Sequence, residues 1–473
     1  MQSRVYIQTF GCQMNKLDST LISSALTQAG FQPAAGANDA DIVLLNTCSV
    51  RNHAEQRVLS HLGHLKHLRQ TRPQLVVGVI GCMAQRLGAE LLHHPAVDIV
   101  CGPAQIPQIT ALVTEALEQK KKQLSITKQI RRRTPQKQAQ ALDEFESAYD
   151  SAENQPPNQA FVRVMHGCDN FCSYCVVPYV RGPETSRSPA AIIEQVKRLA
   201  GEGVKLITLL GQRVNAYRYT TGEKTLYLAD LLEAASTVEG IEWIRFVTNY
   251  PAEEFFDAIL KAMAGLPKVC KYLHMPAQSG SDKILKLMNR RYTAGQYLEL
   301  LDGAKTAVPE IAVSGDFIVG FPGETDEDFA ATVELLKKAR YKNSFIFKYS
   351  PRPGTRADKK LADTVPAEVK IQRNIELLAV QQKISDQLSG KFLGKEVKIL
   401  VEGLSKKPHL DTAGKEGQPQ LVGRTAKDWI VVFNGPAELA GQFVKVKITK
   451  TSPLTLFGEI IGQSTFSPSS VLI

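Results

Sequence analysis

The chain has 473 residues, 43% of them hydrophobic, which at roughly 150 residues per domain is material for about three domains. Its 57 Lys and Arg against 47 Asp and Glu give a net charge of +10, which favours a polyanionic partner such as nucleic acid. The eight scattered cysteines do not resemble a secreted disulfide framework, and we see no leader peptide or long apolar run. We therefore expect a cytoplasmic protein without a membrane span.

Residues 1–116 alternate between strand-like and helix-like segments. The predicted strands are 5–8, 42–45, 76–80 and 97–100, and the helix-like stretches between them are 16–29, 54–69 and 84–92. This alternation predicts a doubly wound α/β domain. In such a domain, ligands gather at the carboxyl ends of the strands.

Cys12, Cys48 and Cys82 each follow one of the first three predicted strands. A single buried thiol is common in protein cores. Three thiols at the same topological point should instead converge on one edge of the sheet, and they predict a three-thiolate iron–sulfur site. Cys101 follows the fourth strand and is either a fourth ligand or a spare buried thiol, because spacing does not decide between them.

Residues 117–159 are polar and segregated by charge, which predicts a solvated linker. An accessory strap that binds RNA is the alternative. The basic residues of this segment are Lys120, Lys121, Lys122, Lys128, Arg131, Arg132, Arg133 and Lys137, and the acidic residues that follow are Asp143, Glu144 and Glu146.

Residues 160–389 contain six strand candidates separated by helices, which predicts a partial (β/α)6 barrel whose open side admits a large substrate. The candidates are 161–165, 205–210, 244–248, 271–275, 314–320 and 344–349. Active-site residues of parallel barrels follow the strands. Cys270 precedes a strand, so we expect it in the core. Thr325 and Asp328 have the form of a capping box and should start a helix.

Cys168, Cys172 and Cys175 lie within HGCDNFCSYC, with no fourth cysteine nearby. Each thiolate can bind one iron of a [4Fe–4S] cube, and the missing ligand leaves the fourth iron open. A zinc knuckle is the alternative, although zinc sites usually have four ligands. The spacing resembles the radical S-adenosylmethionine (SAM) superfamily, in which SAM chelates the open iron.

Residues 390–463 are rich in β-branched and basic side chains, with strands expected within 396–402, 420–434 and 442–461. They predict a small β-barrel of the oligonucleotide-binding kind. Trp429 and Phe433 either stack on bases or fill the core. The candidate phosphate contacts are Arg424, Lys445, Lys447 and Lys450.

Over nearly its whole length, the chain resembles the methylthiotransferase family of radical SAM enzymes. The phrases that carry this resemblance are TFGCQMN, NTCSVR, CVVPYVRG, LLGQRVNAYR, HMPAQSGSDKILKLMNR, DFIVGFPGET and YSPRPGT. The resemblance implies an N-terminal domain with an auxiliary cluster, a radical SAM barrel and a C-terminal TRAM domain. Cys101 lies outside the ligand pattern of the family.

The resemblance also implies a reaction, the placement of a methylthio group on C2 of N6-isopentenyl-adenosine in the tRNA anticodon stem-loop. It implies two [4Fe–4S] clusters, with SAM as radical source and methyl donor, and no catalytic side chain beyond these cofactors. It further implies an electron donor such as flavodoxin or ferredoxin, a sulfur source and a monomeric enzyme. The residues assigned to SAM are Tyr174, Gln212, Gln278 and Asp316.

Three alternatives stay open at this point. Sibling enzymes methylthiolate threonylcarbamoyl-adenosine in tRNA or an aspartate of a ribosomal protein, although NTCSVR and CVVPY favour the isopentenyl-adenosine substrate. The third alternative is an iron–sulfur module that binds RNA without turnover. The stretches PAQSGSD and GFPGET argue against it, because they have no purpose without SAM.

Overall fold

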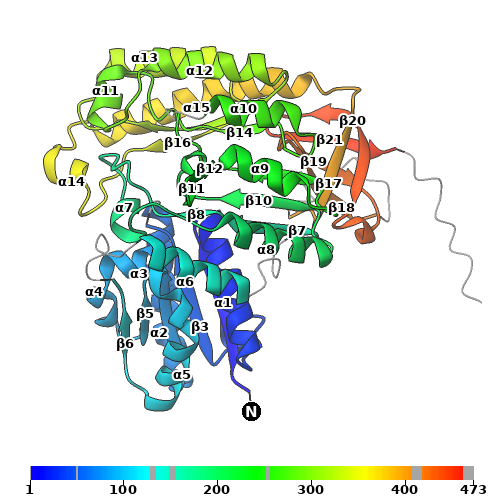
Figure 1. The fold of residues 1–473 in the computed structure, drawn as a ribbon. Helices are drawn as coiled ribbons and strands as arrows, with labels where there is room; N and C mark the ends of the chain where they lie inside the picture. Colours follow the sequence, from blue (N-terminus) through cyan, green and yellow to red (C-terminus); the bar gives the residue numbers. More distant parts are fainter. Residues whose placement is uncertain are drawn as a thin grey trace, which may run out of the picture.

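The computed structural model describes residues 2–49, 52–127, 135–148, 156–251, 256–406 and 418–461. Figure 1 shows an N-terminal part in blue and cyan, a central part in green and yellow, and a small C-terminal barrel in orange and red. Within the described ranges, no helix combines the length and the apolar character that crossing a bilayer requires.

The N-terminal part is a parallel sheet of six strands in the order β2-β1-β3-β4-β5-β6. The strands are β1 (Arg4–Phe10), β2 (Gln32–Pro33), β3 (Ile42–Thr47), β4 (Val76–Gly81), β5 (Ile99–Cys101) and β6 (Gln123–Ser125). One apolar core lies under α1 (Gln13–Gln28) and α5 (Ile109–Gln119). A second core, on the other face, lies under α2 (Asn52–Thr71), α3 (Cys82–Leu87) and α4 (Ala89–Leu92). The doubly wound α/β prediction is confirmed.

The segment expected as a solvated linker differs from that expectation. Residues 123–125 form β6, which extends the sheet beyond residue 116. Helix α6 (Pro135–Ala148) then carries Glu146, whose side chain is fully buried. Lys128 and Arg131–Arg133 lie outside the described residues.

The reason is that the acidic side chains of α6 meet arginines from the central part. Asp143 Oδ1 accepts a hydrogen bond from Arg187 Nε at 2.6 Å, and Glu146 Oε1 lies 2.8 Å from Arg163 Nε. Local polarity predicts solvation, but buried charges are stable where they are paired. The partners come from distant sequence, so composition alone does not reveal them.

The central part contains six parallel strands that form an open barrel, as expected. They are β7 (Gln159–Arg163), β10 (Leu206–Leu210), β13 (Trp243–Phe246), β14 (Tyr272–His274), β15 (Ala312–Val319) and β16 (Asn343–Lys348). Strands β7, β10 and β13 form one sheet and β14, β15 and β16 another, joined by a parallel bridge between Ile244 and Val269. The barrel is therefore open between β7 and β16.

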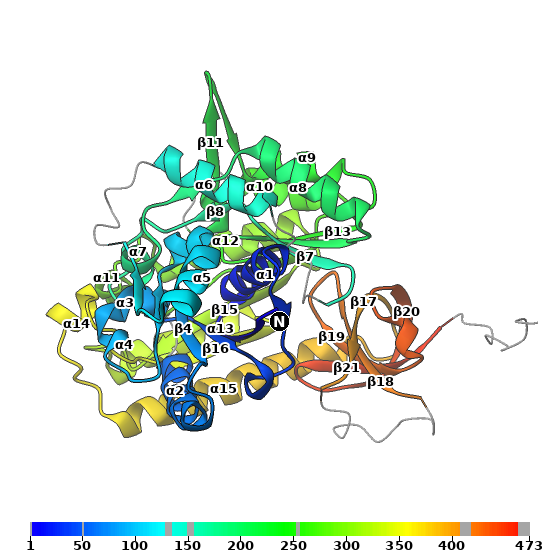
Figure 2. The same ribbon diagram turned by 90° about the horizontal axis from the view of Figure 1, so that it is seen from below.

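Helices cover the outer face of this barrel. The helices of the central part are α7 (Val177–Val180), α8 (Pro189–Gly201), α9 (Leu228–Ser236), α10 (Phe256–Gly265), α11 (Asp282–Leu287), α12 (Ala294–Ala307), α13 (Asp326–Ala339), α14 (Arg356–Lys360) and α15 (Ala367–Gly390). Thr325 and Asp328 form the expected capping box at the start of α13. A hairpin that we did not expect, β11 (Arg218–Thr221) with β12 (Lys224–Tyr227), extends away from the body in Figure 2.

Helix α1 of the N-terminal part packs against the open barrel (Figure 1). Its buried residues Leu17 and Leu21 share one apolar core with Leu210, Val247 and Ala312 of the barrel. Helix α1 also contacts β7 directly. The N-terminal sheet is thereby held against the inner side of the barrel.

The C-terminal part is a closed five-stranded barrel, which confirms the small β-barrel. Its strands are β17 (Glu396–Leu404), β18 (Gln420–Thr425), β19 (Ile430–Asn434), β20 (Phe443–Thr451) and β21 (Thr455–Ile460). Trp429 and Phe433 are 4% and 2% exposed in its core, so the stacking role is wrong for both. The core alternative is the one the structure supports.

This small barrel packs against the amino ends of the central strands. Leu206, Trp243 and Cys270 share an apolar cluster with Leu400, and the rings of Trp243 and Phe443 lie 4.7 Å apart. Cys270 is therefore a core residue at this interface, as expected. The carboxyl ends of the central strands are left for the candidate site.

Candidate functional site

Three cysteines converge at the carboxyl edge of the N-terminal sheet. Cys12 precedes α1, Cys48 follows β3, and Cys82 begins α3 directly after β4. A hydrogen bond with the Cys48 thiol is the main cause that lowers the pKa of Cys12 to about 6. Gly11 permits this approach, because a Cβ there would lie 2.6 Å from Cys48 Cβ.

A pair of asparagines fixes the spacing of these strand ends. Asn15 Nδ2 donates to Asn46 Oδ1 at 3.0 Å, and Asn46 Nδ2 donates to the Asn15 carbonyl at 2.9 Å. The Cys12 thiol donates to Asn15 Oδ1 at 3.2 Å. Gly81 has a φ of +92°, and a Cβ there would lie 2.5 Å from Asn46 Oδ1. The role of Asn15 had no signal in the sequence beyond its place in TFGCQMN.

Cys168, Cys172 and Cys175 lie on the loop between β8 (Met165–His166) and α7. Gly167 starts the loop with a φ of +79°, and a Cβ there would lie 2.0 Å from the Pro183 carbonyl oxygen. Burial raises the pKa of Cys168 to about 12 and also raises the pKa of Cys175. These thiols are protonated at neutral pH and would release protons on binding iron.

The ligand type of the cysteines is that of an iron–sulfur cluster. Among the described residues, no three His, Cys, Asp or Glu side chains are close enough together to hold a single metal ion. In a [4Fe–4S] cube each thiolate binds a different iron, so the ligands are spread around the cube. Two sets of three thiols fit that donor pattern.

The chain segments that carry the two cysteine sets are in contact. Cys82 packs against Val176 and Val180 at the end of the Cys168–Cys175 loop. Arg181 follows directly, and its Nη2 donates to Asp18 Oδ2 on α1 at 2.9 Å. Because α1 begins next to Cys12, this ion pair joins the loop of one set to the helix of the other. The importance of Arg181 and Asp18 was missed, since their contact spans distant sequence.

The residues assigned to SAM lie at two places around the barrel. Gln212 Oε1 accepts a hydrogen bond from the Gly167 amide at 2.7 Å, so it orients the start of the cysteine loop. The ring of Tyr174 packs edge to face against Phe321 at 6.5 Å. Both contacts are within the protein and place these side chains beside the cysteine loop.

The other two residues are adjacent on neighbouring chain segments. The backbone N–H of Gln278 donates to the backbone carbonyl of Asp316 at 2.8 Å, and Asp316 Oδ1 lies 3.3 Å from His274 Nε2. The Asp316 side chain is 23% exposed. It therefore offers a partly exposed carboxylate on β15, which a bound ligand can reach.

Arg290 is a further charged residue that the sequence analysis did not select. Its Nη1 donates to Cys172 Sγ at 3.6 Å, and its Nη2 donates to the Pro276 carbonyl at 3.0 Å. The guanidinium lies 4.3 Å from the ring centre of Tyr250. These contacts hold the guanidinium beside the Cys172 sulfur.

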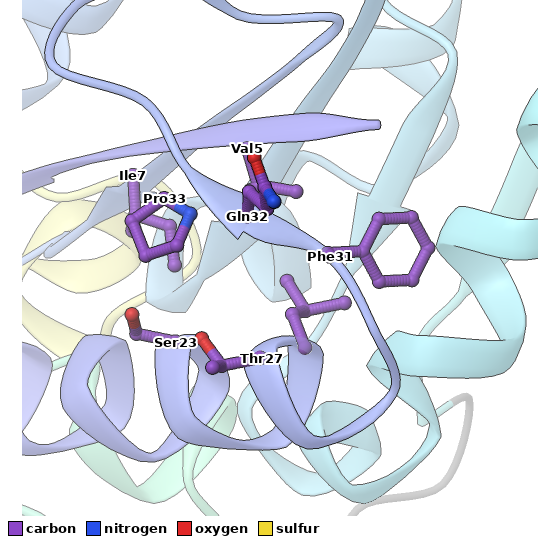
Figure 3. A pocket seen from close by; sticks show the side chains of 8 residues that line it. Val5, Ile7, Ser23, Thr27, Phe31, Gln32 and Pro33 are labelled. Carbon is purple, nitrogen blue, oxygen red and sulfur yellow. The ribbon is translucent and has the colours of Figure 1, made fainter. Parts of the chain in front are cut away.

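An apolar hollow elsewhere is not part of this site. It lies between α1 and the β1–β2 edge and is lined by residues that include Val5, Ser23, Thr27 and Phe31 (Figure 3). These α1 residues are at the end of the helix opposite to Cys12. The hollow therefore does not reach either cysteine set.

Comparisons with known families agree with the three parts. Residues 4–102 match the uncharacterized protein family UPF0004, residues 162–336 the radical SAM superfamily, and residues 390–461 the TRAM domain. The curated tRNA-2-methylthio-N(6)-dimethylallyladenosine synthase of Rhodopirellula baltica is 43% identical, and the match covers 99% of each chain. The enzyme of that name from Thermotoga petrophila is 40% identical, again over 99% of each chain.

Among solved structures, the radical SAM methyltransferase TsrM from Kitasatospora setae, with cobalamin and a [4Fe–4S] cluster bound, has a similar fold. The TM-score is 0.54 at 14% identity, and the match covers 76% of this chain and 74% of that chain. At this level of identity the likeness concerns the fold alone.

Proposed function

Because the chain belongs to the radical SAM family of tRNA-2-methylthio-N(6)-dimethylallyladenosine synthases, we propose that it places a methylthio group on C2 of N6-dimethylallyl-adenosine in the tRNA anticodon stem-loop. The observation that carries the proposal is the contact of Cys82, from one three-cysteine set, with Val176 and Val180, which follow the other set in the chain. A radical source and a sulfur source must both reach the same carbon, and this contact would bring the two sources close together.

The cofactors of this family, SAM and [4Fe–4S] clusters, fit the thiols that are present. Cys168, Cys172 and Cys175 would hold the cluster that binds SAM, and Cys12, Cys48 and Cys82 would hold the auxiliary cluster. When bound, these groups supply an electron, a radical that removes the C2 hydrogen, a sulfur atom and a methyl group.

The residues of the chain position these groups and the substrate. Arg290 holds the Cys172 sulfur by a hydrogen bond, and Gln212 orients the loop through the Gly167 amide. Asp316, braced by His274, would bind a polar group of SAM, together with Gln278. Tyr174, by contrast, would give an apolar wall beside the cysteine loop.

The inner face of edge strand β16 supports a prenylated substrate. Phe345 pairs with Asp316 in the sheet and Phe347 with Ile318, and paired residues of neighbouring strands point to the same side. The two rings are 47% and 37% exposed. Aromatic surface in the barrel suits a dimethylallyl group. It suits the carboxylate of threonylcarbamoyl-adenosine or of a protein aspartate much less.

The C-terminal barrel supports a tRNA partner. Lys445 and Lys447 alternate with buried residues on β20, so both side chains are exposed on one face. Such a row of lysines can contact successive phosphates. An electron donor such as flavodoxin or ferredoxin, a separate sulfur source and a monomeric state complete the proposal.

Mass spectrometry of tRNA nucleosides tests the proposal. A strain without the gene should accumulate N6-dimethylallyl-adenosine without its methylthio group, and the intact gene should restore the product. Anaerobically reconstituted protein should convert tRNA with the prenylated base and leave tRNA with threonylcarbamoyl-adenosine unchanged. Conversion of only the tRNA with threonylcarbamoyl-adenosine would show that the proposed substrate is wrong. Cluster and tRNA binding without any conversion would favour a non-enzymatic module.

A further inference from the structure

Arg181 is buried between the two cysteine sets. Its side chain is 3% exposed, and it follows α7, which closes the Cys168–Cys175 loop. Nη2 donates to Asp18 Oδ2 at 2.9 Å, and Asp18 Oδ1 lies 2.7 Å from Arg163 Nη2. One end of the Arg181 fork is thus fixed by a carboxylate that is itself fully buried.

The other end of the fork has an unused donor. Among the described residues, buried Nη1 of Arg181 has no hydrogen-bond partner of full geometry. The residue before it, Val180, packs against Cys82, and the guanidinium lies next to that thiol. A buried donor without a full hydrogen bond is unfavourable, and an anionic sulfur at this place would give it a partner.

We propose that Arg181 is a positioning residue for the auxiliary cluster, in which Nη1 donates a hydrogen bond to a sulfur at the Cys82 corner while Nη2 stays on Asp18. This inference deepens the proposed function and rests on it, because it assumes a cluster on Cys12, Cys48 and Cys82. It assigns a role to a residue that belongs to the barrel rather than to the domain that holds the cluster.

The geometry requires arginine rather than a general positive charge. The planar guanidinium can bind Asp18 and a sulfur at the same time, whereas the ammonium of a lysine is a point charge on a flexible stem. Because Asp18 lies on α1 and Arg181 follows α7, the bridge fixes the cluster domain relative to the cysteine loop. The sulfur is thereby held toward the place where SAM binds.

Two measurable effects follow. Hydrogen bonds to sulfur and nearby positive charge raise the reduction potential of an iron–sulfur cluster. Arg181→Met should therefore shift the midpoint potential of the auxiliary cluster to a more negative value. Outer partners of this kind typically change activity by about 10–100-fold, so methylthio transfer should fall by about that factor. Reductive SAM cleavage should persist.

The potential is best measured in full-length protein with Cys168, Cys172 and Cys175 replaced by alanine, so that only the auxiliary cluster contributes. A redox titration followed by EPR then compares Arg181, Arg181→Met and Arg181→Lys. The matched control is Arg69→Met, which removes a guanidinium paired with Asp98 at 2.6 Å elsewhere in the same domain. The control should leave the potential unchanged.

Each outcome decides the inference. Arg181→Lys keeps the charge but not the bridge, so it should retain iron and shift the potential less than Arg181→Met does. A potential that stays the same in both variants would overturn the inference, as would a shift in Arg69→Met of the same size. If Arg181→Met loses its iron, its potential has no cluster to report on. The inference is then tested by the potential of Arg181→Lys compared with that of the protein with intact Arg181. If the protein with the three alanine replacements and intact Arg181 binds no iron, the assignment of an auxiliary cluster to Cys12, Cys48 and Cys82 is wrong. The proposed function would then be wrong as well.

Discussion

Nη1 of Arg245 on the central barrel lies 3.1 Å from Oδ1 of Asp428 in the turn between β18 and β19 of the C-terminal barrel. Lys342 Nζ lies 3.5 Å from the other carboxylate oxygen, and Arg424 Nη1 lies 3.1 Å from Oδ1. These three cations keep the pKa of Asp428 below its usual value although burial raises it. One carboxylate thus joins the two barrels electrostatically.

Replacing this carboxylate should destabilise the protein strongly. Asp428→Asn leaves Arg245 and Lys342 buried without their counter-charge, a change that costs about 3–5 kcal/mol. Thermal unfolding should show a clear fall in Tm. The control is Glu310→Gln, which removes a largely exposed ion pair with Lys427 and should cost at most about 1 kcal/mol. A fall no larger than that of the control would contradict the role of Asp428.

Arg424 should now behave as a structural residue. The sequence suggested a phosphate contact, but its Nε also lies 3.0 Å from Glu402 Oε1. Arg424→Ala should therefore lower Tm and leave the salt dependence of tRNA binding nearly unchanged. Replacing Lys445 and Lys447 by glutamine should leave Tm nearly unchanged. It should reduce the slope of the tRNA binding constant against salt concentration, on logarithmic scales, by about two units. Filter binding at several salt concentrations measures both. A larger change of this slope in Arg424→Ala than in the lysine variant would show that Arg424 contacts phosphate after all.

The cysteine loop of the barrel should control SAM chemistry alone. The reconstituted protein should hold about eight irons, four per cube. Replacement of Cys168, Cys172 and Cys175 by alanine should leave about half of this iron and abolish reductive SAM cleavage. Iron analysis and chromatography of 5′-deoxyadenosine check this. Persistent cleavage would show that SAM is activated elsewhere.

The N-terminal cysteines should separate cleavage from transfer. Replacement of Cys12, Cys48 and Cys82 by alanine should remove methylthio transfer and about half of the iron, while uncoupled SAM cleavage continues. Cys101→Ala is the control, because Cys101 is fully buried in the core beneath α1 and α5. It should keep both clusters. Iron loss in the control would make Cys101 a ligand, and equal loss of both activities in the triple variant would indicate a structural role.

Much of the fold could be predicted because local patterns and topology act together. The β–α alternation placed Cys12, Cys48 and Cys82 at strand ends, and parallel strands bring such ends to one edge. The CxxxCxxC spacing identified the second set without any long-range information. The strands of both barrels were likewise visible in their apolar runs.

The rest depends on pairs that lie far apart in sequence. Glu146 looked like part of a solvated linker, and Asp18 looked like an ordinary polar residue of a helix. Both are buried because Arg163 and Arg181 neutralise them across a domain boundary. From the sequence, Trp429 could either stack on a base or pack in a core, and the closed barrel shows that it lies in the core. Periodicity reports which face of an element is apolar but not which partner meets a buried charge.

Specificity for the prenyl group should depend on the inner face of β16. Phe345→Ala removes apolar surface that a dimethylallyl group would cover, so kcat/KM for tRNA with the prenylated base should fall by about tenfold or more. For tRNA with unmodified adenosine, any residual kcat/KM should change little, because that base lacks the group. Leu454→Ala, an exposed residue of the C-terminal barrel, is the matched control. Iron content should stay constant, since Phe345 lies on β16 and not on the segments that carry the six cysteines. An equal loss with both tRNAs would show that Phe345 supports the barrel rather than the choice of substrate.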